Sequence, residues 1–141
     1  MHKYLHAKGG IVEQSDAPLA ASAGVLYGKG VFTTLRIEGG RPFLFEKHLR
    51  RLSENARAVG LASVEDAAIG AGLEAVIAAN EVASGRARIT LLDASQSSIW
   101  GGSGETATEL QIFTGDLRPV PGKLRLGVSP FAVNSASPLA G

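Results

Sequence analysis

Three side chains that can bind ligands fall on one stripe of a predicted helix, because His48, Arg51 and Asn55 are spaced three and four residues apart. That spacing places them on the same side of a helix, beside its apolar face. A guanidinium at the rim of a pocket offers parallel donors to phosphate or carboxylate oxygens, so Arg51 is a candidate anion ligand. In the alternative interpretation, Arg51 and its basic neighbours only solvate the helix and pair with Glu46 or Glu54.

The element that carries this stripe is the best-defined helix of the chain, and we expect it over Glu46–Val59. Its apolar residues recur at the spacing of one helical face. They are Phe45, Leu49, Leu52, Ala56 and Val59. Gly60 follows the last turn, where a glycine commonly ends a helix. The helix therefore presents Arg51 from the edge of a surface that must be buried.

A second candidate lies on a predicted strand over Arg86–Leu92, in which Arg86, Arg88 and Thr90 alternate with apolar residues. Side chains two apart in a strand point to the same face of a sheet. Two arginines on one face can bind a carboxylate. An exposed charged face without a ligand explains the same pattern equally well, so the residues alone leave both interpretations open.

Just before the first helix we expect a hairpin that feeds directly into it. Val31–Ile37 is rich in β-branched and aromatic residues, Gly39-Gly40 suits a two-residue primed turn, and Phe43-Leu44-Phe45 is expected to return as the second strand. Gly28 and Gly30 are interpreted as positions where the backbone makes room for Tyr27 and Phe32 to approach a pocket or a neighbouring chain.

An opening hairpin of Tyr4–Ala7 and Ile11–Glu13 around Gly9-Gly10 is expected at one edge of the sheet. His2 and His6 are interpreted as part of an exposed strand face of this hairpin.

A second helix is expected over Val64–Asn80, with Ser63 as its N-cap and Asp66 completing a capping box. Its expected core face consists of Ile69, Leu73, Val76, Ile77 and Asn80. Two further strands, Glu109–Thr114 and Leu124–Val128, follow a polar, glycine-rich loop that contains Trp100. The order of elements predicts an α+β domain: a mixed, largely antiparallel sheet with two helices packed on one side.

The composition narrows the possible functions. The 141 residues, 45% hydrophobic and 19% charged, are enough for one domain with a real core. A net charge of +1 gives no field that would recruit nucleic acid or an anionic membrane. The chain has no cysteine, and its three histidines lack metal-site spacing, so we expect no metal centre. Without a signal peptide or an apolar run of about 20 residues, a soluble cytoplasmic protein is expected.

The run Gly28-x-Gly30-Val31-Phe32-Thr33-Thr34, followed by a hairpin and by His48-Leu49-Arg50-Arg51-Leu52, resembles the start of the class IV aminotransferase family. These are the fold-type IV enzymes that depend on pyridoxal 5'-phosphate. The resemblance extends from about Tyr4 to Gly141. It implies the small N-terminal domain of the D-amino-acid aminotransferase-like fold, with residues 1–132 as that domain and 133–141 as the start of an interdomain connector.

The same resemblance implies roles for single residues. Arg51 matches the arginine of an H-x-x-R-L motif that binds the cofactor phosphate, and Phe32 and Arg88 fall at the substrate pocket. From its place in the glycine-rich loop, Trp100 is interpreted as either an anchor or a lid residue that faces the substrate, and we count it among the substrate-binding candidates. The loop Val25-Leu26-Tyr27 implies a homodimer contact. The ending Pro138-Leu139-Ala140-Gly141 implies that the lysine forming the Schiff base, and a larger C-terminal domain, lie beyond this chain, which alone would be inactive.

Within the family, Phe32-Thr33-Thr34 resembles the 4-amino-4-deoxychorismate lyases, which release pyruvate to give 4-aminobenzoate. Branched-chain and D-amino-acid aminotransferases usually carry an acidic residue at the position of Thr33, and the latter carry Arg-x-His where this chain has Ser98-Ile99-Trp100. Lys29 replaces an aspartate common in the family. Such an aminotransferase is the alternative activity, and a non-catalytic α+β binding or dimerisation module is the alternative class.

Overall fold

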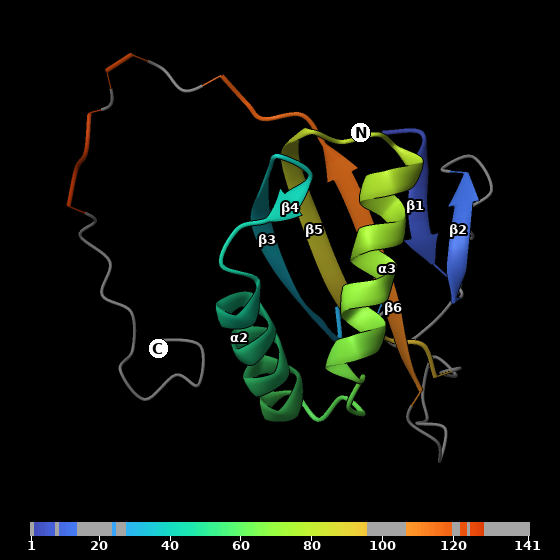
Figure 1. Cartoon of the computed structure of the whole chain (residues 1–141). Coiled ribbons are helices and arrows are strands. Elements are labelled where there is room, and N and C mark those ends of the chain that lie inside the picture. Colours follow the sequence, from blue (N-terminus) through green and yellow to red (C-terminus); the bar gives the residue numbers. More distant parts are fainter. Residues whose placement is uncertain are drawn as a thin grey trace.

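A computed structural model describes residues 2–7, 9–13, 24, 28–95, 107–119, 122–123 and 125–128. These residues form a six-stranded sheet and two helices, and both helices cover the same face of the sheet (Figure 1). The expected α+β class with its two helices on one side is therefore confirmed. Within the described ranges, no helix is long and apolar enough to cross a membrane.

The strands are β1 (Tyr4–Ala7), β2 (Gly10–Glu13), β3 (Gly30–Glu38), β4 (Arg41–Pro42), β5 (Ser84–Asp93) and β6 (Thr108–Gly115). Their order across the sheet is β2-β1-β6-β5-β3-β4, and each of these neighbouring pairs is antiparallel. The sheet is thus purely antiparallel where it is described, rather than mixed. The β1–β2 hairpin lies at one edge, as its sequence predicts.

Helix α2 (Phe45–Ala58) packs against β3, and its predicted apolar face is confirmed by the burial of Leu49, Leu52 and Ala56. Gly60, with φ +70°, ends the helix: the Leu61 amide donates to the Ala56 carbonyl over 2.9 Å. That bond closes a Schellman-type end, which is the role expected of this glycine.

Helix α3 (Asp66–Ala79) covers β1 and β6, and it buries the expected Ile69, Leu73, Val76 and Ile77. The predicted capping box is wrong: the helix begins two residues later than expected, its N-cap is Glu65, and no side chain caps it. Val64 packs against the core from outside the helix. Its burial keeps the Ser63–Glu65 segment out of the helix, so Ser63 is too far upstream to cap.

The second strand of the β3–β4 hairpin is shorter than predicted. Gly39 and Gly40 have positive φ values of +57° and +73°, as a primed turn requires, but β4 ends at Pro42. Phe43 and Leu44 form a turn, and Phe45 is already the first residue of α2. Phe45 packs against the core as part of the apolar face of the helix, and this contact draws the chain away from the sheet.

The strand predicted over Leu124–Val128 is also wrong. Residues 125–128 have no regular structure, and Leu126 and Val128 are 95% and 99% exposed. An alternating sequence forms a strand only beside another strand that accepts its backbone hydrogen bonds, and no described strand pairs with this segment.

The hydrophobic core lies between the helices and the sheet face that they cover. Alternate residues of β3 and β5 point into it, including Val31, Leu35, Ala87 and Ile89. The intervening residues, such as Phe32 and Arg88, therefore lie on the opposite face. Each candidate functional residue on β3 and β5 therefore lies either on the face covered by the helices or on the opposite face.

Candidate functional site

Thr33 interrupts the apolar inward positions of β3 and forms the centre of a polar cluster beneath α2. Its side chain is 1% exposed. The Arg51 guanidinium donates from Nη2 to Thr33 Oγ1 over 2.6 Å, and His48 Nδ1 lies 2.7 Å from the same oxygen. The predicted stripe of His48 and Arg51 is therefore tied to a buried hydroxyl of the sheet.

The protonation of this cluster follows from its donors and acceptors. Arg51 has only donors, so Thr33 Oγ1 accepts from it and keeps one proton to give away. Burial, and secondarily the charge of Arg51, lower the pKa of His48 below its usual value. Neutral His48 then accepts the Thr33 proton at Nδ1, which leaves its Nε2 as a donor. The cluster carries a net positive charge located on Arg51.

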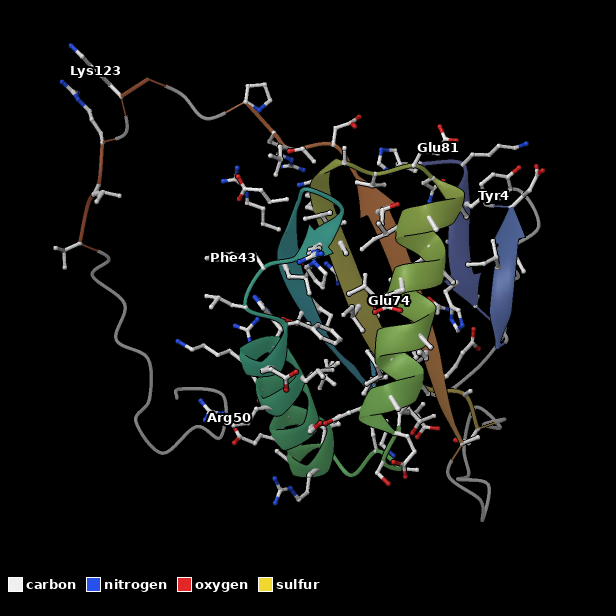
Figure 2. All side chains as sticks on the ribbon, in the orientation of Figure 1. Tyr4, Phe43, Arg50, Glu74, Glu81 and Lys123 are labelled. Atoms are coloured by element: carbon white, nitrogen blue, oxygen red, sulfur yellow. The ribbon has the colours of Figure 1, made fainter. Side chains whose placement is uncertain are left out.

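Arg51 does not form the ion pairs of the alternative interpretation. Within the described ranges no carboxylate lies within ion-pair distance of its guanidinium, whether from Glu46 or from Glu54. Arg50, by contrast, extends from the solvent side of α2, away from the sheet (Figure 2). It lines a shallow hollow of about 490 Å³ with Glu46, Glu54 and Arg57. The two adjacent arginines therefore have different environments.

Phe32 and Arg88 lie together on the face of the sheet opposite the helices. The Arg88 guanidinium carbon lies 3.5 Å from the centroid of the Phe32 ring, and Phe32 is 52% exposed. Arg86, Arg88 and Thr90 share this face, as their alternation predicts. A guanidinium stacked on an aromatic ring is held in place while its N–H edge remains able to bind an anion.

Strand β3 carries one residue of each group, Thr33 on the helix face and Phe32 on the open face, and one edge of this strand is largely uncovered. Residues 30–36 of β3 pair with β5 on one side, while β4 pairs only with Ile37 and Glu38 on the other. In the part of the chain that the structure describes, no strand covers the remaining edge of β3. Arg51 lies on the helix face beside this edge and Phe32 on the open face, so a ligand along the edge could contact both.

An ion pair between half-buried Lys29, just before β3, and buried Asp93, at the end of β5, joins the strands that carry these residues. Lys29 Nζ lies 2.7 Å from Asp93 Oδ2, and the Asp93 carboxylate also accepts hydrogen bonds from the amide and hydroxyl of Ser95. The Lys29 and Ser95 bonds lower the pKa of Asp93 to about 2. At Gly30, an added Cβ would lie 2.9 Å from the backbone carbonyl oxygen of Leu91, which cannot move aside as a side chain could. Only glycine therefore lets the start of β3 approach the end of β5 this closely.

The histidines of the first hairpin are not on an exposed face, contrary to the sequence interpretation. His2 Nδ1 is hydrogen-bonded to Thr114 Oγ1 over 2.9 Å, and its Nε2 lies 3.2 Å from Asp116. His6 lies beneath α3, where a Cβ on Gly72 would come within 3.2 Å of its ring. The missing side chain of Gly72 gives the ring room, and the sequence offered no signal of this contact.

The structure places some predicted site residues and leaves others outside its described ranges. Arg51 and Phe32 flank the open edge of β3, and Arg88 lies one strand further in, on β5, against Phe32. Trp100 and the Val25-Leu26-Tyr27 loop lie outside the described residues. Reasoning from sequence identified the Thr33 position only through family resemblance. A lone threonine among inward apolar residues was a signal that could have found its contact with Arg51.

The fold defines the structural class of this domain, and comparison with known proteins identifies its family. The antiparallel sheet and the two one-sided helices define an α+β domain, with an anchored arginine beside an uncovered strand edge. The sequence pattern of the class IV amino-transferases matches residues 30–141, and the chain belongs to this family.

Relatives and solved structures agree with the assignment. An aminodeoxychorismate lyase of Bacillus subtilis (strain 168) is 33% identical over 89 residues, which cover 62% of this chain and 30% of that protein. The 4-amino-4-deoxychorismate lyase of Pseudomonas aeruginosa is 25% identical, with a TM-score of 0.69 over 83% of this chain and 41% of that one. A PLP-bound hypothetical aminotransferase from Mycobacterium tuberculosis, 24% identical, has a TM-score of 0.66 over 82% and 40%. The chain thus spans about two fifths of these structures.

The cofactor of the family is pyridoxal 5'-phosphate. The residues of this chain suit its phosphate, because Arg51 is an exposed residue whose positively charged guanidinium is anchored by a buried hydroxyl. A planar guanidinium can present two N–H groups to phosphate oxygens. Within the described residues, no group of three histidines, aspartates or glutamates could hold a metal ion.

Proposed function

We propose that this chain forms the small domain of a pyridoxal-phosphate enzyme, in which Arg51 binds the cofactor phosphate. The observation that supports this role is the 2.6 Å bond between Arg51 Nη2 and the buried Thr33 hydroxyl. That bond uses one donor of the guanidinium and leaves others for an anion. Thr33 and neutral His48 carry no charge, so they orient Arg51 and leave its positive charge available. An acidic residue at position 33 would neutralise that charge.

The activity we propose for the whole protein is that of a 4-amino-4-deoxychorismate lyase: 4-amino-4-deoxychorismate gives 4-aminobenzoate and pyruvate. The Phe32-Thr33-Thr34 sequence and the two lyase relatives support this choice over transamination. When bound, the cofactor supplies an electron sink beside the amino-bearing carbon of the substrate. This chain contributes phosphate binding through Arg51 and, at the open face, a substrate surface formed by Phe32 and Arg88. We assign Trp100 to the same surface from its place in the polar, glycine-rich loop alone.

The test of the proposed activity is to incubate the protein that contains this chain with 4-amino-4-deoxychorismate and pyridoxal 5'-phosphate. We expect equimolar 4-aminobenzoate and pyruvate. Transfer of an amino group from a branched-chain or D-amino acid to a keto acid, without 4-aminobenzoate, would favour the aminotransferase alternative. If the protein catalyses neither reaction and does not bind the cofactor, the result would favour the non-catalytic module. The chain alone should release no product if, as the resemblance implies, the Schiff-base lysine lies downstream.

We further propose that the whole protein is a cytoplasmic homodimer, with the Val25-Leu26-Tyr27 loop at the contact. The support is the apolar character of this loop beside Gly28 and Gly30. Sedimentation at micromolar concentration should give the mass of a dimer, and a strict monomer would contradict the proposal.

A further inference from the structure

The open face of the sheet has an arginine-rich hollow beyond Arg88. The hollow measures about 690 Å³, and its lining includes Thr34, Arg86, Arg88, Phe113, Leu117 and Arg118. Three guanidiniums from β5 and from the segment after β6 thus border one concave surface. The volume is sufficient for a small organic molecule.

The position of Arg86 is electrostatically unfavourable unless an anion binds to its guanidinium. In the register of the sheet it lies directly opposite Arg36 of β3, and like charges directly opposite one another destabilise a strand pair. Arg36 has a partner, because its Nη2 lies 3.5 Å from Glu38 Oε1. Arg86 is half-buried, and in the described part of the chain it pairs with no carboxylate.

The acidic groups near the hollow do not cancel its charge. Among the described residues of the lining, Asp116 is the one carboxylate; its side chain is 90% exposed, and it lies 3.2 Å from His2. Three guanidiniums against one carboxylate make this described part of the lining net positive. The imbalance is local, because the whole chain has a net charge of only +1.

We infer that Arg86, together with Arg118, forms a second carboxylate subsite, so that this face binds small dicarboxylates rather than monocarboxylates. One carboxylate would contact Arg88, whose guanidinium is held against Phe32, and the other would contact Arg86 and Arg118. The inference rests on the proposed function, since it takes the Phe32–Arg88 face as the substrate side. It fits 4-amino-4-deoxychorismate, which carries two carboxylates, and disfavours branched-chain amino acids, which carry one.

The test uses two probes of equal length, succinate and its monoamide succinamate, in which one carboxylate is replaced by a neutral amide. Each is titrated into this chain at constant ionic strength, while the arginine Nε–Hε resonances are followed by NMR. We expect saturable shifts at Arg86 and Arg88, and binding of succinate about tenfold tighter than that of succinamate. Equal affinity for the two probes, or no saturable shift with succinate, would overturn the inference.

Variants assign the preference to particular residues. Arg86→Gln should bring the affinities for the two probes to within about twofold of one another. Because Arg118 is exposed, Arg118→Gln should lower the preference for succinate over succinamate without affecting folding. Arg57→Gln on the solvent side of α2 is the matched control and should retain the full preference. If Arg86→Gln does not fold, Arg118→Gln decides alone, and an unchanged preference there overturns the inference. Cofactor binding through Arg51 is measured separately, so each proposal can fail while the other stands.

Discussion

The role of Arg51 depends on a single buried hydroxyl. A threonine with 1% exposure on an otherwise apolar strand face costs free energy unless its hydroxyl is satisfied, and Thr33 satisfies it with both Arg51 and His48. The long side chain of Arg51 would otherwise sample many rotamers at the surface. We therefore propose that Thr33 is a positioning residue that holds the guanidinium ready for an anion.

Replacing Thr33 by valine tests this positioning role. Valine has nearly the same shape, so the core stays filled, but His48 Nδ1 loses its donor and Arg51 loses its anchor. We expect the free energy of unfolding to fall by about 1–2 kcal/mol, measured by urea denaturation. Cofactor affinity in the whole protein should fall about tenfold, while Thr33→Ser should retain it. An unchanged affinity in Thr33→Val would show that Arg51 needs no anchor.

At this scale the sequence indicates which residues can bind ligands but not their partners. The helical period placed His48 and Arg51 on one stripe, which the structure confirms. It could not show which strand residue lies beneath them, because that depends on how α2 is rotated against β3. The Lys29–Asp93 pair could not be predicted either, because the two residues are far apart in sequence and meet only when β3 pairs with β5.

Among the elements, the β3–β5 pair carries most of the candidate site, and the Lys29–Asp93 bond fixes its end. The hydrogen bonds from Lys29 and Ser95 lower the pKa of Asp93 in the folded chain from its ordinary value of 3.8 to about 2. The depressed pKa means that its contribution to stability is full above pH 4. The contribution is lost as the pH falls through about 2, because the unfolded chain takes up the proton first.

Lys29→Met should remove this contribution while keeping the length of the side chain. It leaves a buried carboxylate without its cation, so we expect a loss of about 1–3 kcal/mol in the free energy of unfolding at pH 7. The difference between the variant and the parent chain should shrink between pH 4 and pH 2, as measured by denaturant midpoints. A constant difference across that range would mean that Lys29 stabilises through packing instead.

The elements that the sequence predicted correctly are those whose periodicity agrees with their burial. Helix α2 and strand β5 combine a clear period with a matching buried face. The predictions failed where tertiary contacts override local preference. Val64 is held outside α3 by the core, Phe45 begins a helix instead of extending a strand, and residues 125–128 lack a strand partner.

For the whole molecule, the important property is that the two faces of the sheet serve different purposes. The helices cover one face and create the core, whereas the other carries the Phe32–Arg88 stack and the arginine-rich hollow. The uncovered edge of β3 joins the two. Since the chain spans about two fifths of the solved structures it resembles, we propose that the remainder of the protein completes the site along this edge.

The measurement that tests the central claim most directly is a cofactor titration of Arg51→Ala and Arg50→Ala in the protein that contains this chain. Pyridoxal 5'-phosphate and phosphate-free pyridoxal serve as the two ligands. If Arg51 binds the phosphate, Arg51→Ala should weaken binding of pyridoxal 5'-phosphate by about 2–3 kcal/mol and leave pyridoxal binding unchanged. Arg50→Ala, about 100° around the helix, should affect neither ligand. Equal losses in both variants, or no loss in either, would contradict the assignment of Arg51 to the cofactor phosphate.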